Sequence, residues 1–447
     1  MSRPDATAAA ERTLAADELF FSTTDARGVI RQGNSVFARI SGYDLDEMVG
    51  APHNMVRHPR MPAGVFRLMW DTLGQRRPMA AYVCNQARDG ATYWVFAVIS
   101  PLHDGFVSVR MAPRGEHLEV VRKVYAEALA VEEQATSMRG ITRREAAALG
   151  AETIESALRR SGYDSYAAFM LEALPAEIAA RTNLVTTTYA RPDAVGQIAT
   201  VLSSTTAVDR VLETLVARLS GYGELGTELA STAEHVVEMG HRLEGSVAAA
   251  QEASLAPGSK PVLANVARVM AQPMTDALES LAQMPTQFAH LREDLAHLRF
   301  QIGLARLYND MAAGFAAEVH DGRAPAESLG AVPLLCDAVQ ECVEDMVVQV
   351  QRVNADLREV ATGVAAAATL LEDFRRFIGQ WRMLAQRHAR VALGARMQEI
   401  DTEIYASWTW TDQLRDLGHQ AGAAIVTFDA ALLRSHLDAV RPQRASA

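Results

Sequence analysis

Residues 50–62, which read GAPHNMVRHPRMP, concentrate the side chains most able to hold a polar ligand. Arg57 presents a planar fork of N–H donors that suits a phosphate group or the polar edge of a flat ring. His53 and His58 add further donors, and three prolines restrict the backbone, so the segment has little conformational entropy left to lose. The segment therefore predicts a stiff, cationic loop at a binding site.

The loop lies within residues 19–112, whose residue types and turn signals predict a small α+β module. Aromatic and β-branched runs such as TYWVFAVI at 92–99 favour strands, and glycines in turn context allow the chain to reverse between them. Five strands are expected, at about 19–25, 28–33, 79–86, 91–100 and 105–111.

Short helices are predicted between the second and third strands. Asp44 followed by Glu47 indicates an N-cap and capping box for a helix from Leu45 to Val49, and a second helix is expected from Ala63 to Leu73. Strands and helices in this order predict an antiparallel sheet with helices on one face and a pocket between them.

The rest of the chain is predicted to be an all-α coiled-coil or helical-bundle region. Apolar residues recur at alternating spacings of three and four, as in the a/d seam of a coiled coil. This seam comprises Met346, Val350, Val353, Leu357, Val360, Val364, Ala367, Leu371, Phe374, Ile378 and Trp381. Shorter seams are expected over 222–243 and 288–302. Seams this narrow are commonly completed by a second chain, so a homodimer through the helices is expected.

Four segments are predicted: a flexible N-terminal tail (1–18), the α+β module (19–112), a helical connector (113–192) and the long helical region (193–447). Residues 141–192 indicate compact helices without a readable function.

Composition excludes several classes of function. The net charge of -11 and the absence of a basic, aromatic-rich stretch argue against nucleic-acid binding. Three cysteines without metal-type spacing fit a reducing compartment. The charged N-terminus predicts no signal peptide, and no apolar run predicts a transmembrane segment, so a soluble cytoplasmic protein is expected.

One resemblance links these observations. The segment FSTTDARGVIRQGNSVFARISGYDLDEMVGAPHNMVRHP at 21–59, then MPAGVFRLMW and DGATYWV, closely resembles the PAS sensory domain of bacterial aerotaxis receptors. The likeness covers about residues 19–112, and VYAEALA at 124–130 resembles that family's next helix. The region 300–319 is only faintly similar to the chemoreceptor helical region.

The resemblance implies that the pocket holds FAD and that its redox state is read as oxygen or energy status. Arg57, His53 and His58 are then donors to the cofactor, and Asn34 and Asn85 are strand amides facing the flavin. Phe66 and Trp70 are expected to pack against the ring. The alternatives are structural: aromatic residues that belong to the core, histidines that cap a helix or satisfy backbone groups, and asparagines in a turn or bulge.

The sequence departs from the family pattern at Arg60, Met79, Gln86 and Ala87, which leaves weak or no flavin binding as alternatives. Haem is a second candidate cofactor, with His53, His58 or His103 as axial ligand.

These residues predict a PAS-based redox or oxygen sensor whose helical region docks a signalling protein. A chemotaxis adaptor or histidine kinase is a candidate partner, although the receptor-tip sequence is absent, which argues against direct coupling. No catalytic motif is found, so an enzyme is not expected, with a cryptic kinase the lowest-ranked alternative. The main alternative is a cofactor-free PAS/coiled-coil dimerisation scaffold.

Overall fold

The computed structural model describes residues 11–138, 140–185, 188–254, 261–388, 401–402, 405 and 411–440, although side chains of much of 222–250 lie outside the description. Two compact units are present. The first comprises residues 1–214, 299–346 and 429–447, and the second comprises 215–298 and 347–428.

The first unit is built around a five-stranded antiparallel sheet in the order β2-β1-β5-β4-β3. Its strands are β1 (Phe20–Asp25), β2 (Ile30–Gly33), β3 (Met79–Gln86), β4 (Thr92–Leu102) and β5 (Gly105–Met111). All five expected strands are therefore confirmed. The second begins two residues later than predicted because the turn glycine Gly28, at φ 79°, takes up the reversal.

Three short helices and a 3-10 turn separate β2 from β3. They are α1 (Ser35–Ser41), α2 (Leu45–Met48), η1 (His53–Val56) and α3 (Ala63–Gly74). The capping box of Asp44 and Glu47 forms as predicted, and it starts α2. The sequence analysis did not locate α1, because its N-cap residue was assigned to a strand.

Alternation along the strands gives the sheet two distinct faces. Ser22 of β1 faces a cavity, whereas its neighbour Phe21 packs edge-on against Phe315 of α8 (Pro261–His320), with 5.2 Å between ring centroids. Tyr82 of β3 likewise points away from the cavity and donates a hydrogen bond of 2.7 Å to Glu177 of α6 (Tyr166–Val185). Neighbouring residues of one strand thus contact the cavity on one face of the sheet and a helix on the other face.

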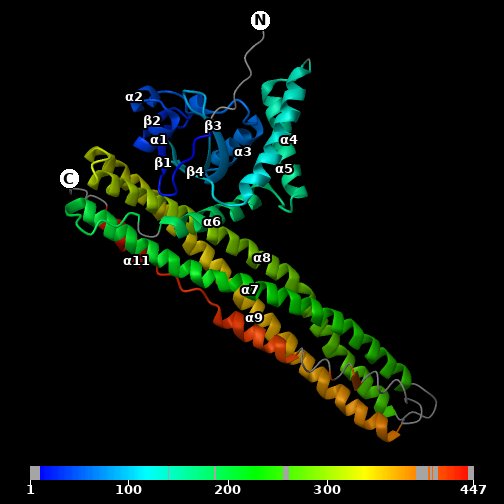
Figure 1. Cartoon of the computed structure of the whole chain (residues 1–447). Coiled ribbons are helices and arrows are strands. Elements are labelled where there is room, and N and C mark those ends of the chain that lie inside the picture. The colour runs from blue at the N-terminus through cyan, green and yellow to red at the C-terminus, as the bar shows by residue number, and fades with distance from the viewer. Residues whose placement is uncertain are drawn as a thin grey trace. The chain divides into compact units, whose positions relative to one another are not determined.

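A helical hairpin packs against α3. It consists of α4 (His117–Ser137) and α5 (Arg143–Arg160), which lie beside α3 in Figure 1. Two glycines allow the close approach: a Cβ on Gly64 would overlap the backbone at Ala151, and a Cβ on Gly150 would overlap the carboxylate of Glu132. Glu132 in turn accepts the backbone N–H groups of Ala63 and Gly64, each at 2.7 Å.

Residues 11–18 belong to the predicted flexible tail, yet they are fixed in the structure. Leu14 is buried, the backbone N–H of Arg12 donates to the Thr92 carbonyl at 2.7 Å, and the Arg12 guanidinium donates to the Ile40 carbonyl at 2.8 Å. The prediction of flexibility is wrong for this part of the tail, because an apolar side chain and a backbone bridge attach it. Residues 1–10 lie outside the described residues.

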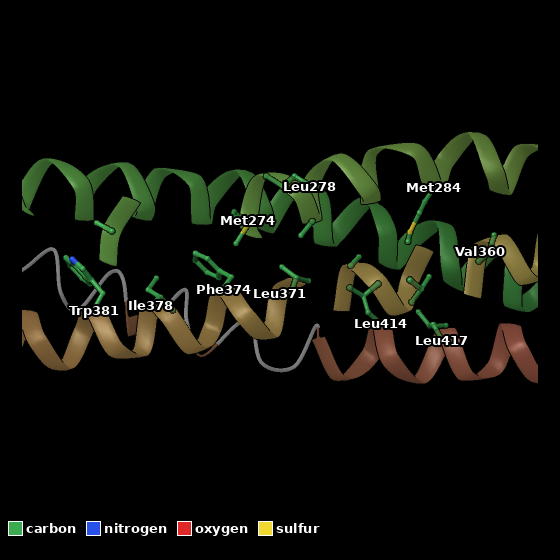
Figure 2. Close-up of a cluster of buried hydrophobic side chains, with 14 of the residues drawn as sticks. Met274, Leu278, Met284, Val360, Leu371, Phe374, Ile378, Trp381, Leu414 and Leu417 are labelled. Carbon is green, nitrogen blue, oxygen red and sulfur yellow. The ribbon is translucent and has the colours of Figure 1, made fainter. Parts of the chain in front are cut away.

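The second unit is a helical bundle. Parts of α7 (Gly196–Ser254), α8 and α9 (Val332–His388) run side by side in it (Figure 1). Figure 2 shows apolar side chains of α8, α9 and the helical residues 411–421 directed toward one another. The remaining described helix, α11 (Ala430–Val440), and the 3-10 turn η2 (Ala326–Ala331) belong to the first unit.

The predicted seam of α9 is buried along its length. Phe374 and Trp381 have almost no exposed surface, and the indole N–H of Trp381 donates to Ser254 Oγ at 3.1 Å. Segments of the same chain supply this burial, so the seam does not need a second chain to cover it, and a homodimer stays a prediction. The side chains of the seam predicted over 222–243 lie outside the description. Among the described residues, no helix combines the length and apolarity needed to span a membrane.

Candidate ligand-binding site

A cavity of about 310 Å³ lies between the sheet and the segment that carries η1 and α3. Its volume is at the lower end of the range found for small-molecule sites. The strands contribute one wall, η1 with the loop before it contributes the second, and α3 contributes an apolar third wall. The lining residues from the strands are Ser22, Thr24, Val83, Asn85, Ala97, Ile99, Phe106, Ser108 and Arg110.

The lining is positively charged. Arg27, Arg57 and Arg110 face the cavity, and among the described residues that line it there is no aspartate or glutamate. Arginine side chains in a wall without carboxylates favour an anionic or electron-rich ligand.

Asn85 is positioned by β3 on the cavity face. Its side chain is 3% exposed, and its buried Nδ2 has no hydrogen-bond partner among the described residues. An amide nitrogen left unpaired in a protein interior is costly, so this group is expected to serve a ligand or a water molecule. The prediction that Asn85 is a strand amide facing the pocket agrees with this position.

His53 enters the cavity from η1. Its ring stacks on Phe37 with centroids 5.4 Å apart and planes 15° apart. Part of the residue surface is exposed, but Nε2 is buried and lacks a partner among the described residues. Burial, and then the charge of Arg110, hold the pKa of His53 well below its usual value, so the imidazole is neutral.

Arg57 follows η1 and lies over the aromatic ring of Phe66, with 4.2 Å from the guanidinium carbon to the ring centroid. One of its terminal nitrogens donates to the Met61 carbonyl at 2.7 Å. Burial lowers the pKa of Arg57, while the charge of Glu132 acts in the opposite direction. The guanidinium is therefore held at the cavity by a cation–π contact and a backbone carbonyl, with donors to spare.

The apolar wall comes from α3, where Phe66 and Trp70 both line the cavity as predicted. Trp70 meets Phe106 of β5 edge-on at 5.5 Å and is 42% exposed, so it stands at the edge of the site rather than in the core. Tyr93, by contrast, is fully buried and does not line the cavity.

Asn34 does not face the cavity, and its placement on a strand was wrong. It is the N-cap of α1: its Oδ1 accepts from Phe21 N at 3.0 Å and Phe37 N at 3.1 Å, while its Nδ2 donates to the Leu19 carbonyl at 2.8 Å. With these groups satisfied, Asn34 fixes the junction of β1 and α1.

His58 is also absent from the cavity wall. Its Nδ1 accepts the backbone N–H of Arg60 at 3.1 Å, so it caps the loop, as the structural alternative proposed. His103 is exposed in the turn before β5. Of the three histidines considered as haem ligands, His53 alone lines the cavity.

The four departures from the aerotaxis pattern lie off the cavity wall. Arg60 is exposed, Met79 and Ala87 are buried elsewhere, and Gln86 donates to the Gly90 carbonyl at 3.5 Å. None of the four residues therefore contacts the cavity directly.

Sequence reasoning missed Arg110, which β5 places inside the cavity. It is 6% exposed and donates to Ser22 Oγ at 3.0 Å. The available signal was a charged residue in the otherwise apolar strand GFVSVRM, on the same face as Ser108.

Comparison with known proteins places this site in context. Residues 32–110 match the family model described as PAS fold. The aerotaxis receptor of Escherichia coli K12 is 39% identical over 117 residues, which are 25% of this chain and 23% of that protein. The nitrogen fixation regulatory protein of Klebsiella pneumoniae is 37% identical over 81 residues, 18% of this chain and 16% of that protein. The chain thus spans less than a quarter of the length of these relatives.

Solved structures with similarity to this chain include light-oxygen-voltage domains. One, described as "Flavin Analogue Sheds Light on Light-Oxygen-Voltage Domain Mechanism", is 18% identical to this chain, and the match covers 24% of this chain and 85% of that chain, with a TM-score of 0.22. The light-state structure of the blue-light photoreceptor Aureochrome1 LOV is 22% identical and covers 26% and 91%, with a TM-score of 0.20.

Proposed function

Because residues 32–110 form a PAS fold that resembles the sensory domain of aerotaxis receptors, we propose that this chain is a redox or oxygen sensor in signal transduction. We propose further that its cavity binds FAD. The observation that carries the proposal is the lining: three arginines, no carboxylate among the described residues, and two buried nitrogens without partners.

The cavity residues fit a flavin. An isoalloxazine ring needs a flat apolar slot with a few polar groups at its edge. Phe66 and Trp70 offer the apolar surface, while His53 Nε2 and Asn85 Nδ2 are available to polar ring atoms. Arg57 would hold the pyrophosphate or the ring edge, since the described residues that line the cavity include no carboxylate.

A bound flavin would supply reversible electron transfer, which changes the charge and hydrogen-bonding capacity of the ring. The amide of Asn85 can respond because it carries both a donor and an acceptor, and a half-turn about its terminal bond exchanges them. Neutral His53 can donate or accept at Nε2 according to its tautomer.

The opposite face of the sheet offers the output route. Phe21 contacts Phe315, Tyr82 donates to Glu177, and Ser100 of β4 accepts from Tyr308. In each of these strands the adjacent residue lines the cavity. A small displacement of a cavity-lining residue would therefore shift its neighbour in the same strand. That neighbour contacts α6 or residues 299–320 of α8.

The helical region would dock a signalling protein rather than catalyse a reaction, the chain would act in the cytoplasm, and a homodimer is compatible with this role. Nucleic acid is not the expected partner, given the net charge of -11.

Haem is a second candidate because His53 presents an unpaired imidazole nitrogen to the cavity. An absorption spectrum of the purified full-length chain distinguishes the cases. Flavin bands that bleach on addition of dithionite support the proposal, whereas a Soret band indicates haem. A colourless protein that does not bind added FAD favours the cofactor-free scaffold.

Arg57→Ala tests the site itself. Loss of a charge-assisted contact, worth about 1.5–3 kcal/mol, should weaken FAD binding roughly tenfold to a hundredfold. Arg57→Lys should recover part of the loss. Arg60→Ala, at an exposed arginine three residues away and off the cavity, is the matched control and should bind FAD as the wild type does. Unchanged FAD affinity in Arg57→Ala would remove Arg57 from the site.

A further inference from the structure

Arg110 is a buried cation without a carboxylate. Its side chain lies in the cavity wall, and no aspartate or glutamate among the described residues approaches it within ion-pair distance. It donates a hydrogen bond to Ser22 Oγ at 3.0 Å and makes a cation–π contact with Phe20 at 4.7 Å. Burial lowers its pKa to about 10, so it still carries its charge at neutral pH.

This arrangement differs from that of the two other arginines described as buried in the unit, Arg181 and Arg306; Arg306 pairs with Asp209 at 3.0 Å. Arg181 is equally enclosed but pairs with the carboxylate of Asp310, which compensates its charge. A buried guanidinium normally requires such a partner, because desolvation of an unpaired charge is costly. The position of Arg110 in the cavity wall suggests that its counter-charge belongs to the ligand.

The side chains next to Arg110 do not supply a negative charge to balance it. His53 is neutral, burial raises the pKa of Tyr93 so that its hydroxyl stays neutral, and Ser22 offers a hydroxyl dipole. A guanidinium has five N–H donors, and one of those of Arg110 is used by Ser22. The cavity therefore has a fixed positive charge with free donors at its inner wall.

We propose that Arg110 makes the cavity selective for the more negatively charged oxidation state of its ligand, and so sets the redox threshold of the sensor. The inference rests on the proposed function, with FAD as ligand. If an external reductant such as dithionite supplied two electrons and water supplied one proton, a bound flavin ring would gain one negative charge. Arg110 stabilises that charge relative to the neutral oxidised ring, which raises the reduction potential.

Arg57 and Arg110 therefore have separable roles. Arg57 is half-buried and close enough to Glu132 to be influenced by its charge, and it is expected to strengthen binding of both oxidation states. Arg110 is enclosed, so water screens its field less, and it discriminates between the states.

The test is a spectroelectrochemical titration of the full-length chain with bound FAD, in wild type, Arg110→Gln and Arg110→Lys. Arg110→Gln should lower the ratio of reduced-state to oxidised-state affinity at least tenfold, which corresponds to about 30 mV for a two-electron couple. Arg110→Lys retains the charge and should stay within threefold of wild type. Arg57→Lys, as comparison, should change the affinity for both states while leaving their ratio within threefold.

A second readout follows proton uptake. Between pH 7 and 8 the wild type should take up one proton per two electrons, because Arg110 keeps the reduced ring anionic. Arg110→Gln should move this number toward two at the lower end of that range. A merely structural role of Arg110 would not alter this stoichiometry in protein that retains FAD.

The outcomes distinguish the two proposals. A wild type that neither contains nor binds FAD overturns both. A wild type that binds FAD but takes up two protons per two electrons, or an Arg110→Gln variant with an unchanged affinity ratio, overturns the role of Arg110 alone. If Arg110→Gln does not retain FAD, the wild-type proton stoichiometry and the potential of Arg110→Lys still decide the question.

Discussion

The hydroxyl group of Tyr308 in α8 donates a hydrogen bond to Oγ of Ser100 in β4, with 2.6 Å between the two oxygens. Both groups are buried, so each depends on the other for its hydrogen bond. We expect Ser100→Ala and Tyr308→Phe to destabilise the first unit, and their double-mutant cycle in urea unfolding to give a coupling of about 0.5–1.5 kcal/mol. If the effects of the two substitutions are additive, the two residues are not coupled, and this hydrogen bond is not part of the proposed output route.

Substitution of Asn34 should mainly lower stability, whereas substitution of Asn85 should mainly change the spectrum of the bound ligand. Asn34→Ala removes the acceptor of two backbone N–H groups and the donor to Leu19, so the free energy of unfolding should fall by about 1–3 kcal/mol. Asn85→Ala removes an unpaired nitrogen and should cost less stability, but it should shift the spectrum of bound flavin. Chemical denaturation and absorption spectra measure the two effects, and the reverse pattern would contradict both assignments.

The contact between α3 and the α4–α5 hairpin should tolerate no side chain at Gly150. Gly150→Ala would displace the Glu132 carboxylate, which leaves the N–H groups of Ala63 and Gly64 without their acceptor. We expect a loss of about 1–3 kcal/mol in unfolding free energy, together with weaker FAD binding because α3 carries the apolar wall. Gly74→Ala is the matched control, since open space surrounds Gly74 at the end of α3. Equal stability of the two variants would show that the hairpin can move away.

His53 should make the stability of the chain depend on pH. In the unfolded chain His53 binds a proton near its ordinary pKa of 6.5, whereas in the folded chain burial lowers its pKa well below that value. The unfolded state then binds more protons as the pH falls below about 6.5, so stability decreases on acidification by up to about 1.4 kcal/mol per pH unit. His53→Gln lacks this contribution and should show a shallower decrease between pH 7 and 5. Parallel pH curves for the two proteins would contradict the buried, neutral state of His53.

The bundle of the second unit should depend on Phe374. This residue is 1% exposed in the apolar cluster of Figure 2, and Phe374→Ala should lower the free energy of bundle unfolding by about 3–5 kcal/mol. Met383→Ala, at a residue of α9 that is 66% exposed, should change it by less than about 0.5 kcal/mol. Thermal unfolding followed by circular dichroism provides the comparison.

Local patterns were sufficient to predict much of the N-terminal module. Alternating aromatic and β-branched residues located the five strands, and the pair Asp44 and Glu47 located α2. The loop 50–62 was recognised from its residue types, and Arg57 and His53 lie at the cavity as expected.

The wrong predictions concern side chains whose direction is set by where an element begins or ends, to within one residue. Asn34 was expected to occupy a strand position, but β2 ends at Gly33 and Asn34 is the N-cap of α1. His53 and His58 are alike in sequence, and the 3-10 turn decides that the first faces the cavity. The seam of α9 indicated burial correctly, but an apolar stripe does not specify whether its cover comes from the same chain or another.

The two-sided sheet makes strand length a functional variable in its own right. Inserting one residue in β1 ahead of Phe21 and Ser22 would exchange their sides, turning a phenyl ring toward the ligand and a hydroxyl toward α8. A two-residue insertion would restore both orientations. The strands can therefore change length only by even numbers of residues if each side chain is to keep its side of the sheet.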